Sequence, residues 1–265
     1  MKHALSEASL PRGFRFAATA CGLKKTGALD LAVISSDVPA SAAAVFTQNL
    51  VVAAPVTISK EHLRASKGRM RAVIVNSGNA NCATGSAGHA AALKTVAETA
   101  KRLGCTASEI IVCSTGVIGV PLAVDKVLRS LPKLSRNRRP SARSFAELSL
   151  AICTTDTRPK TAGASFKMAG KKIHLVGCAK GAGMIHPNLA TMLAFVVTDA
   201  AIAPPLLQKT LRDACSRTFN CISIDGDSST NDTLLVFANG AAGAPAIRPG
   251  NAAHRAFAAA LEEVC

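Results

Sequence analysis

Seven short runs of apolar and β-branched residues, each bounded by Gly, Asn, Asp or Ser, most strongly constrain the fold of this chain. Runs with this composition and these flanking residues are typical of buried β-strands. The predicted strands cover residues 30–36, 71–76, 109–114, 172–177, 191–198, 222–225 and 233–238. Apolar residues at helical spacing predict helices over 86–103, 122–131, 145–153 and 206–219. The elements follow no strict βαβ rhythm and no G-x-G-x-x-G follows a strand, so we expect an α/β fold other than a Rossmann fold.

The apolar residues of the chain are mostly small or branched. Hydrophobic residues make up 49% of the 265 residues, but aromatic residues only 3%, with no Trp and no Tyr. A core of Ala, Val, Leu and Ile packs closely, as in layered α/β folds, and the length suffices for one large domain or two small ones. No apolar run reaches the ~18 residues of a membrane span, and the N-terminal residues lack a secretory apolar segment. We therefore expect a soluble, cytoplasmic protein without a membrane partner.

Charge and cysteine usage narrow the classes of ligand. The formal net charge of +15 suits nucleic acid, acidic membranes or anionic small molecules. The charge is spread along the chain, and few aromatic residues are available to stack on bases, so we expect no nucleic-acid partner. The densest basic cluster, at 133–143, is interpreted as a solvated linker between helices. Nine cysteines without a C-x-x-C pair, and six scattered histidines, predict reduced, buried thiols and no metal site.

Three polar, Gly-rich stretches lie at predicted strand ends. The first, VNSGNANCATG at 75–85, suits either a tight turn lining a cleft or a plain strand–helix connection. The second, CSTGVIGVPL at 113–122, can expose a hydroxyl and a backbone N–H together, a pair that can hold a developing oxyanion, although Ser-Thr-Gly turns are common. The third, IDGDSSTNDTLL at 224–235, lacks the ligand spacing of a calcium loop and is interpreted as a polar hairpin or bulge.

A fourth stretch, CAKGAGMIHPNLATMLAF at 178–195, places Thr191 at the start of a predicted buried strand, directly after a Gly- and Pro-containing turn. Most threonines in such positions simply begin a strand. If the preceding peptide bond is cut, however, the α-amine of Thr191 can act as the base toward its own hydroxyl. A nucleophile of this kind needs no Ser-His-Asp set, and no G-x-S-x-G motif is present.

Taken together, these motifs resemble those of the ArgJ family of ornithine acetyltransferases, also described as bifunctional glutamate N-acetyltransferases. The resemblance runs through most of the chain, from PRGFRFAATACGLK, DLAVISSDVPASAAAVFTQN and RAVIVNSGNANCATG to VCSTGVIGVPL, TTDTRPK, GCAKGAGMIHPNLATMLAF and SIDGDSSTNDT. It implies a DmpA/ArgJ-like layered α-β-β-α sandwich with a self-processing threonine nucleophile.

The resemblance also implies a precursor that cleaves itself between Ala190 and Thr191, giving an α chain of residues 1–190 and a β chain that begins with residues 191–265. It further implies ping-pong transfer of acetyl from N-acetylornithine to glutamate in arginine biosynthesis, through acetyl-Thr191. No cofactor is implied, although acetyl-CoA is a further candidate donor, and the implied assembly is an α2β2 heterotetramer.

Five residues match functional positions of that family. The resemblance assigns Thr115 and Gly116 to the oxyanion hole, Thr154, Lys180 and Thr191 to the substrate, and no residue to a metal. Further family contacts lie beyond residue 265, and the final residues, NAAHRAFAAALEEVC, end inside a helical pattern, so we expect a C-terminally truncated member. An inactive remnant and a DmpA-type self-processing aminopeptidase remain the alternatives.

Overall fold

The computed structural model describes residues 7–184 and 192–265, whose strands join in one sheet. The strands are β1 (Phe14–Thr19), β2 (Leu31–Phe46), β3 (Arg69–Asn79), β4 (Ile110–Val117), β5 (Lys160–Met168), β6 (Lys171–Lys180), β7 (Leu193–Thr198) and β8 (Thr233–Ala238). The α-helices are α1 (Ala54–Ala65), α2 (Gly85–Leu103), α3 (Val124–Arg136), α4 (Ala142–Ala151), α5 (Pro204–Arg217) and α6 (Ala252–Val264). Single-turn 3₁₀ helices span Glu7–Ser9, Ala107–Glu109 and Phe219–Cys221.

Strand β2 joins the two halves of the sheet. The strand order is β4–β3–β2–β8–β7–β6–β5, with β1 also paired to β2. The first part of β2 pairs with β1 and β3, and its last six residues, 41–46, pair with β8. Between these parts the register with β3 shifts between Ser35 and Ala40, where three consecutive residues are exposed. Such an irregularity bends a strand and increases its twist, which allows the two halves of one sheet to face each other.

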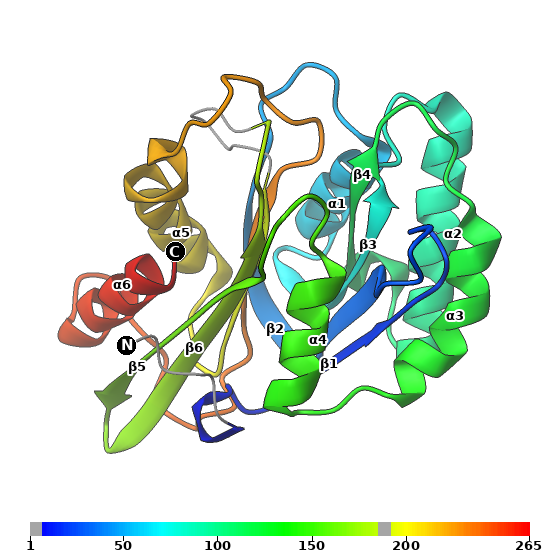
Figure 1. Ribbon diagram of the computed structural model, residues 1–265. Helices are drawn as coiled ribbons and strands as arrows, with labels where there is room; N and C mark the ends of the chain where they lie inside the picture. Colours follow the sequence, from blue (N-terminus) through cyan, green and yellow to red (C-terminus); the bar gives the residue numbers. More distant parts are fainter. Residues whose placement is uncertain (1–6, 185–191) are drawn as a thin grey trace.

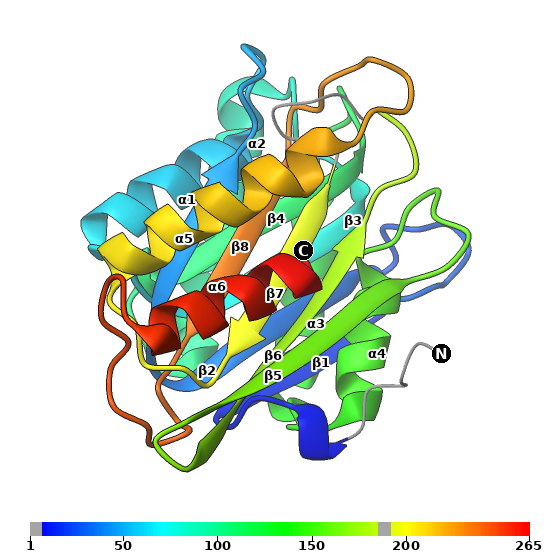
Figure 2. The ribbon, with the colours of Figure 1, turned by 90° about the vertical axis from the view of Figure 1, so that its left-hand side faces the viewer.

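The two halves of the sheet separate the described core into three large hydrophobic clusters, and a fourth, small cluster contains Ala53, Ala80 and Cys82. The inner cluster combines alternate residues of both halves, such as Val73 of β3 and Phe195 of β7, with Phe145 of α4. The Phe145 ring packs edge-on against Phe16 of β1, with 5.1 Å between the ring centroids. Helices α1, α2 and α3 cover the outer face of β2–β4, and α5 and α6 cover that of β6–β8 (Figures 1 and 2). Because both faces of these strands are buried, the strands appear in the sequence as continuous apolar runs.

These layers confirm the predicted α/β class and the α-β-β-α arrangement. The structure adds that the two β layers are hydrogen-bonded parts of one sheet through β2 and β8. Helix α4 packs against β1, and its buried side chains belong to the inner cluster (Figure 1).

The prediction of a strand at 222–225 is wrong. These residues form an exposed loop after the turn Phe219–Cys221, and Ile222 and Ile224 are 43% and 59% exposed. Their alternating pattern suits a half-buried strand, but no strand in the described part of the chain pairs with them, and β-propensity depends on such context. The sequence patterns also did not predict β1, β5, α1 or α6 as complete elements. Strand β5 is half exposed and rich in Lys, Gly and Ala, which weakens its strand signal.

Two further expectations concern thiols and membranes. All nine cysteines are free thiols, and Cys82, Cys113, Cys178 and Cys215 are buried, whereas Cys221 is exposed, against the expectation of burial. Within residues 7–184 and 192–265, no helix combines the length and apolar character that crossing a membrane requires.

Candidate functional site

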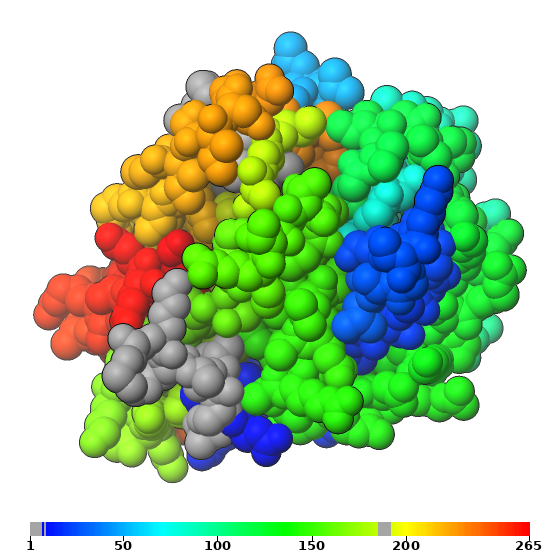
Figure 3. Space-filling model, in the orientation of Figure 1, coloured from blue at the N-terminus to red at the C-terminus, as the bar shows by residue number. Residues whose placement is uncertain are grey.

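A cavity of about 1030 Å³ opens where β3, β4 and β6 end. Its walls come from the β1–β2 loop, the ends of β3 and β4, the α4–β5 connection, residues 180–184 and the polar segment 229–231. The β1–β2 loop forms a blue surface lobe beside green segments of the chain (Figure 3). Segments far apart in the sequence therefore meet at one hollow, because the parallel strands β3 and β4 end at the same edge of the sheet.

The floor of the cavity is built by Thr115 and Gly116 at the end of β4. Gly116 pairs with Gly78 of β3, and the register of the two strands becomes irregular at Gly78 and Asn79. Gly116 has a φ of +134°, and a Cβ there would lie only 2.4 Å from the Gly78 carbonyl carbon. Only glycine fits both conditions, because L side chains avoid this φ and because the atom in the way belongs to the backbone. Thr115 is buried beside it.

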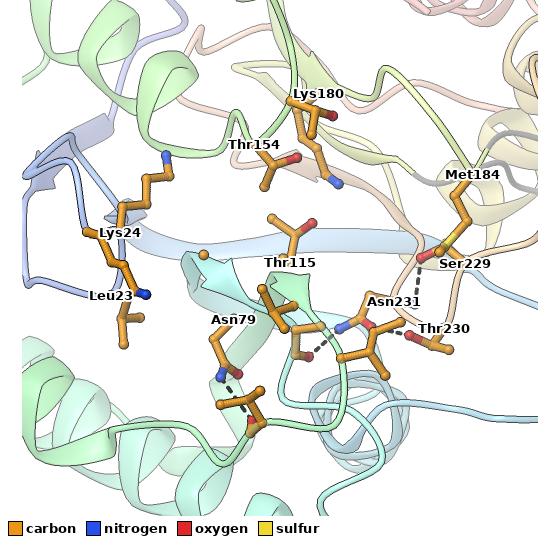
Figure 4. A pocket seen from close by; sticks show the side chains of 18 of the residues that line it. Leu23, Lys24, Asn79, Thr115, Thr154, Lys180, Met184, Ser229, Thr230 and Asn231 are labelled. Carbon is orange, nitrogen blue, oxygen red and sulfur yellow. Dashed lines mark hydrogen bonds between the residues drawn. The ribbon is translucent and has the colours of Figure 1, made fainter.

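Three asparagines hold this floor in place. Asn79 donates from Nδ2 to the Val120 carbonyl oxygen at 3.0 Å, which fixes the loop after β4. Asn231 donates from Nδ2 to the carbonyl oxygens of Ala80 and Ser114, at 2.7 and 2.9 Å, so it fastens the segment before β8 to the end of β3 and to β4 (Figure 4). Asn76 accepts at Oδ1 from the Ser114 hydroxyl at 2.6 Å. The third polar stretch is thus an ordered wall of the cavity at residues 229–231.

Lys180, at the end of β6, is the buried cation of the cavity. Its side chain is 3% exposed and points toward the hydroxyls of Thr154 and Thr115 (Figure 4). In the described part of the chain, its Nζ has neither a hydrogen-bond nor an ion-pair partner. Burial lowers the pKa of Lys180, while the charges of Asp232 and Asp156 act to raise it. A buried ammonium without a partner is well placed to bind a carboxylate.

Asp156 fixes the segment on which Thr154 lies. Its Oδ1 accepts from the Gly181 N–H at 2.9 Å and from Lys160 Nζ, and the Lys160 ammonium also donates to the Gly181 carbonyl oxygen at 3.0 Å. Burial acts to raise the pKa of Asp156, but the hydrogen bonds from Lys160 and Gly181 outweigh it and hold the pKa below its ordinary value. The α4–β5 connection is therefore tied to the chain directly after Lys180.

Asp30 organises the opposite wall. Its fully buried carboxylate accepts hydrogen bonds from the backbone N–H groups of Cys21, Leu23 and Lys24, at 2.6, 2.6 and 2.9 Å. This arrangement places Lys24 at the cavity, where its Nζ donates to the Leu29 carbonyl oxygen at 2.8 Å. Burial lowers the pKa of Lys24.

The described lining residues include four lysines but no His, Cys, Asp or Glu. The lysines are Lys24, Lys25, Lys126 and Lys180. An anionic ligand is therefore favoured, and no lining side chain in the described ranges is a carboxylate or imidazole base. No group of three or more His, Cys, Asp or Glu in those ranges is arranged to hold a metal ion.

Four of the residues predicted from the sequence line this one cavity: Thr115, Gly116, Thr154 and Lys180. Ala190 and Thr191 lie outside the described residues, although Ala182, Gly183 and Met184 line the cavity. Asp30, Asp156 and Asn231 were not predicted from the sequence. In the sequence, Asp30 begins the predicted strand 30–36, Asp156 lies in the TTDTRPK motif, and Asn231 lies in the third polar stretch.

The chain matches the model of the ArgJ family over residues 15–265. It is 48% identical to the arginine biosynthesis bifunctional protein ArgJ of Geobacter sulfurreducens over 253 residues, which cover 96% of this chain and 63% of that relative. The chain therefore spans less than two thirds of that relative's length.

Solved structures agree with this match. The arginine biosynthesis bifunctional protein ArgJ of Bacillus halodurans superposes with a TM-score of 0.66 at 35% identity, covering 72% of this chain and 95% of its own. An ornithine acetyltransferase of Mycobacterium tuberculosis, solved with ornithine, gives a TM-score of 0.60 at 35% identity, covering 72% and 97%. The L-aminopeptidase D-Ala-esterase/amidase of Ochrobactrum anthropi, a variant of the Ntn-hydrolase fold, gives a TM-score of 0.59 at 11% identity over 100% of this chain and 86% of its own, which shows a shared fold alone. Sequence and structure agree that this chain belongs to the ArgJ family.

Proposed function

We propose that this chain is the acetyl-transferring part of a glutamate N-acetyltransferase of arginine biosynthesis. In this proposal, the chain cleaves itself between Ala190 and Thr191, and Thr191 then carries acetyl from N-acetylornithine to glutamate. The observation that carries the proposal is one cavity that combines Thr115, Gly116, Thr154 and the buried Lys180. Relatives named as bifunctional ArgJ proteins of arginine biosynthesis support it.

The described lining residues include no carboxylate or imidazole, which favours a nucleophile that brings its own base. An N-terminal threonine does so, because its α-amine accepts the proton of its own hydroxyl. The length of the proposed α chain is also similar to the matched length of one solved relative. The matched region of the Bacillus halodurans chain covers 72% of the 265 residues, or about 191 residues, and 95% of that solved chain.

Self-cleavage begins with attack of the Thr191 hydroxyl oxygen on the Ala190 carbonyl carbon. The C–N bond breaks, the hydroxyl proton passes to the departing nitrogen, and an ester forms between the two residues. Water then hydrolyses the ester, which releases the Ala190 carboxylate and leaves Thr191 with a free hydroxyl and a free α-amine. The Thr115 hydroxyl and the Gly116 N–H are the proposed donors to the oxyanion in these steps.

Acetyl transfer uses the same groups in two half-reactions. The Thr191 oxygen attacks the acetyl carbon of N-acetylornithine, its proton passes to the α-amine and then to the departing nitrogen, and ornithine leaves. The amine of glutamate next attacks the acetyl carbon, the ester C–O bond breaks, and a proton of that amine passes through the Thr191 α-amine to the released Thr191 oxygen. Lys180 is proposed to hold the α-carboxylate of either amino acid, because its buried ammonium has no partner in the described ranges and lies beside Thr154.

The second acetyl donor, the assembly and the cellular location are tested separately. Acetyl-CoA is a second candidate donor, an α2β2 heterotetramer is the expected assembly, and the cytoplasm is the expected location. Donor-dependent glutamate acetylation, native mass spectrometry and cell fractionation test these points in turn.

Intact-mass spectrometry of the purified chain tests the central claim. We expect one species that ends at Ala190 and one that begins at Thr191, and we expect Thr191→Ala to remain uncut. With N-acetylornithine, the Thr191 species should gain one acetyl group, and glutamate should remove it.

Three other outcomes would contradict the proposal. A chain that stays intact after prolonged incubation would identify an inactive remnant. Release of amino acids from peptides without acetyl transfer would identify a self-processing aminopeptidase. Cleavage at the same bond in Thr191→Ala would exclude Thr191 as the nucleophile.

A further inference from the structure

One buried carboxylate beside the cavity has an oxygen without a partner. Asp232 precedes β8, is 1% exposed, and accepts at Oδ1 the backbone N–H of Met192 at 2.8 Å. Its Oδ2 is fully enclosed yet makes no hydrogen bond of good geometry within residues 7–184 and 192–265, and the Ser229 side chain lies near enough only to lower the pKa of the carboxyl. An unpaired buried carboxylate oxygen costs free energy, so its presence points to a group that it binds at another stage.

The backbone around Asp232 is held rigidly. Its carbonyl oxygen accepts the Thr47 N–H at 3.0 Å, and the Thr233 N–H donates to the Met192 carbonyl oxygen, also at 3.0 Å. Met192 is therefore hydrogen-bonded through its N–H to the Asp232 side chain and through its carbonyl oxygen to Thr233, the first residue of β8. The carboxylate and the residue that follows Thr191 form one fixed unit.

The charges around Asp232 favour an additional cation at Oδ2. Burial raises the pKa of Asp232 to about 7, while the Met192 N–H, Ser229 and the charge of Lys180 act to lower it. The positive charge of Lys180, at the end of β6, lowers the pKa of Asp232. Lys180 is in turn influenced by Asp156 and Cys153 from the α4–β5 connection and by Lys160 of β5.

Covalent geometry limits the distance between the backbone nitrogens of Thr191 and Met192. Three bonds, of about 1.46, 1.52 and 1.33 Å, separate the nitrogen of Thr191 from the nitrogen of Met192, so the two nitrogens lie no more than about 4 Å apart. Met192 N is itself hydrogen-bonded to Asp232. Cleavage of the Ala190–Thr191 bond creates one new cation, the α-ammonium of Thr191.

We propose that Asp232 is the positioning residue for the α-amino group of Thr191, whose hydrogen bond Oδ2 accepts once the Ala190–Thr191 bond is cut. The inference rests on the proposed function. In the intact chain this nitrogen is an uncharged amide. After cleavage it is an amine that takes the proton of the Thr191 hydroxyl during attack and passes it to the departing nitrogen. Asp232 keeps its own charge, orients the amine and stabilises the ammonium between these transfers.

The first test measures the pKa of the Asp232 carboxyl by ¹³C NMR, in the uncut Thr191→Ala variant and in the cleaved wild-type protein. We expect cleavage to lower this pKa by about 1–3 units, because an opposite charge then lies within about 4–6 Å. The same pKa in both proteins would overturn the assignment. This comparison leaves Asp232 unchanged, so it does not depend on how a variant of Asp232 folds.

The second test measures the pKa of the Thr191 α-ammonium in protein labelled with ¹³C-threonine. Asp232→Asn keeps an acceptor for the Met192 N–H but removes the charge, so we expect the ammonium pKa to fall by about 1–3 units. Asp227→Asn removes an exposed carboxylate from the same connection and should leave the pKa unchanged. Equal pKa values in Asp232→Asn and wild type would contradict the inference. Absence of any chain beginning at Thr191 would instead refute the proposed function itself.

Discussion

Replacing Gly116 by alanine tests whether the cavity floor depends on glycine. The φ of +134° alone costs an L residue about 1–3 kcal/mol. The new Cβ would also lie 2.4 Å from the Gly78 carbonyl carbon and 2.5 Å from the Asn79 nitrogen. These backbone atoms belong to a paired strand and cannot rotate away, so overpacking adds about 1–3 kcal/mol. The total of about 2–6 kcal/mol is a large part of the 5–15 kcal/mol that stabilises a typical domain.

Gly119 provides a matched control in the same connection. It also has a positive φ, of +80°, but its Cβ would meet nothing within 4 Å, so Gly119→Ala should cost only about 1–2 kcal/mol. Urea unfolding followed by far-UV circular dichroism measures both variants, since the chain has no Trp or Tyr for intrinsic fluorescence. If Gly116→Ala proved no less stable than Gly119→Ala, the close approach of β3 and β4 would not govern this position. Self-cleavage should also slow more in Gly116→Ala, because the displaced N–H belongs to the proposed oxyanion hole.

Two other side chains of the site give separate predictions. Lys180→Met should leave self-cleavage intact but lower kcat/KM for N-acetylornithine by about 10–100-fold, the effect of losing one charge-assisted hydrogen bond, whereas the exposed Lys172→Met on the same strand should not. Equal acetyl-transfer kinetics for both variants would remove Lys180 from the substrate site. Asp232 binds its proton more tightly in the folded chain, with a pKa near 7 against an ordinary value of 3.8, so rising pH should destabilise the uncut protein. Uncut Thr191→Ala should therefore lose about 3 kcal/mol relative to Thr191→Ala/Asp232→Asn between pH 4 and pH 7, and parallel denaturation curves at all pH values would contradict this.

The sequence by itself determined the fold class and most of the buried strands. The apolar runs that became β3, β4, β7 and β8 are readable because both of their faces are buried, which selects apolar residues at consecutive positions. Local motifs also marked Thr115, Gly116, Thr154 and Lys180 through the family resemblance, and all four line one cavity. Residues 222–225 carried a similar local pattern but formed a loop, because pairing depends on neighbours that a local pattern does not contain.

Only the tertiary structure decided how residues of remote segments change one another's pKa values and limit one another's space. Lys180 ends β6 and Asp232 precedes β8, and they influence each other's pKa only because both are buried at the same end of the sheet. The hydrogen bond from Met192 to Asp232 and the 2.4 Å approach at Gly116 likewise arise between segments that the sheet brings together. Burial and the distances between atoms of remote segments set these pKa values and steric limits, and both quantities exist only in the folded chain.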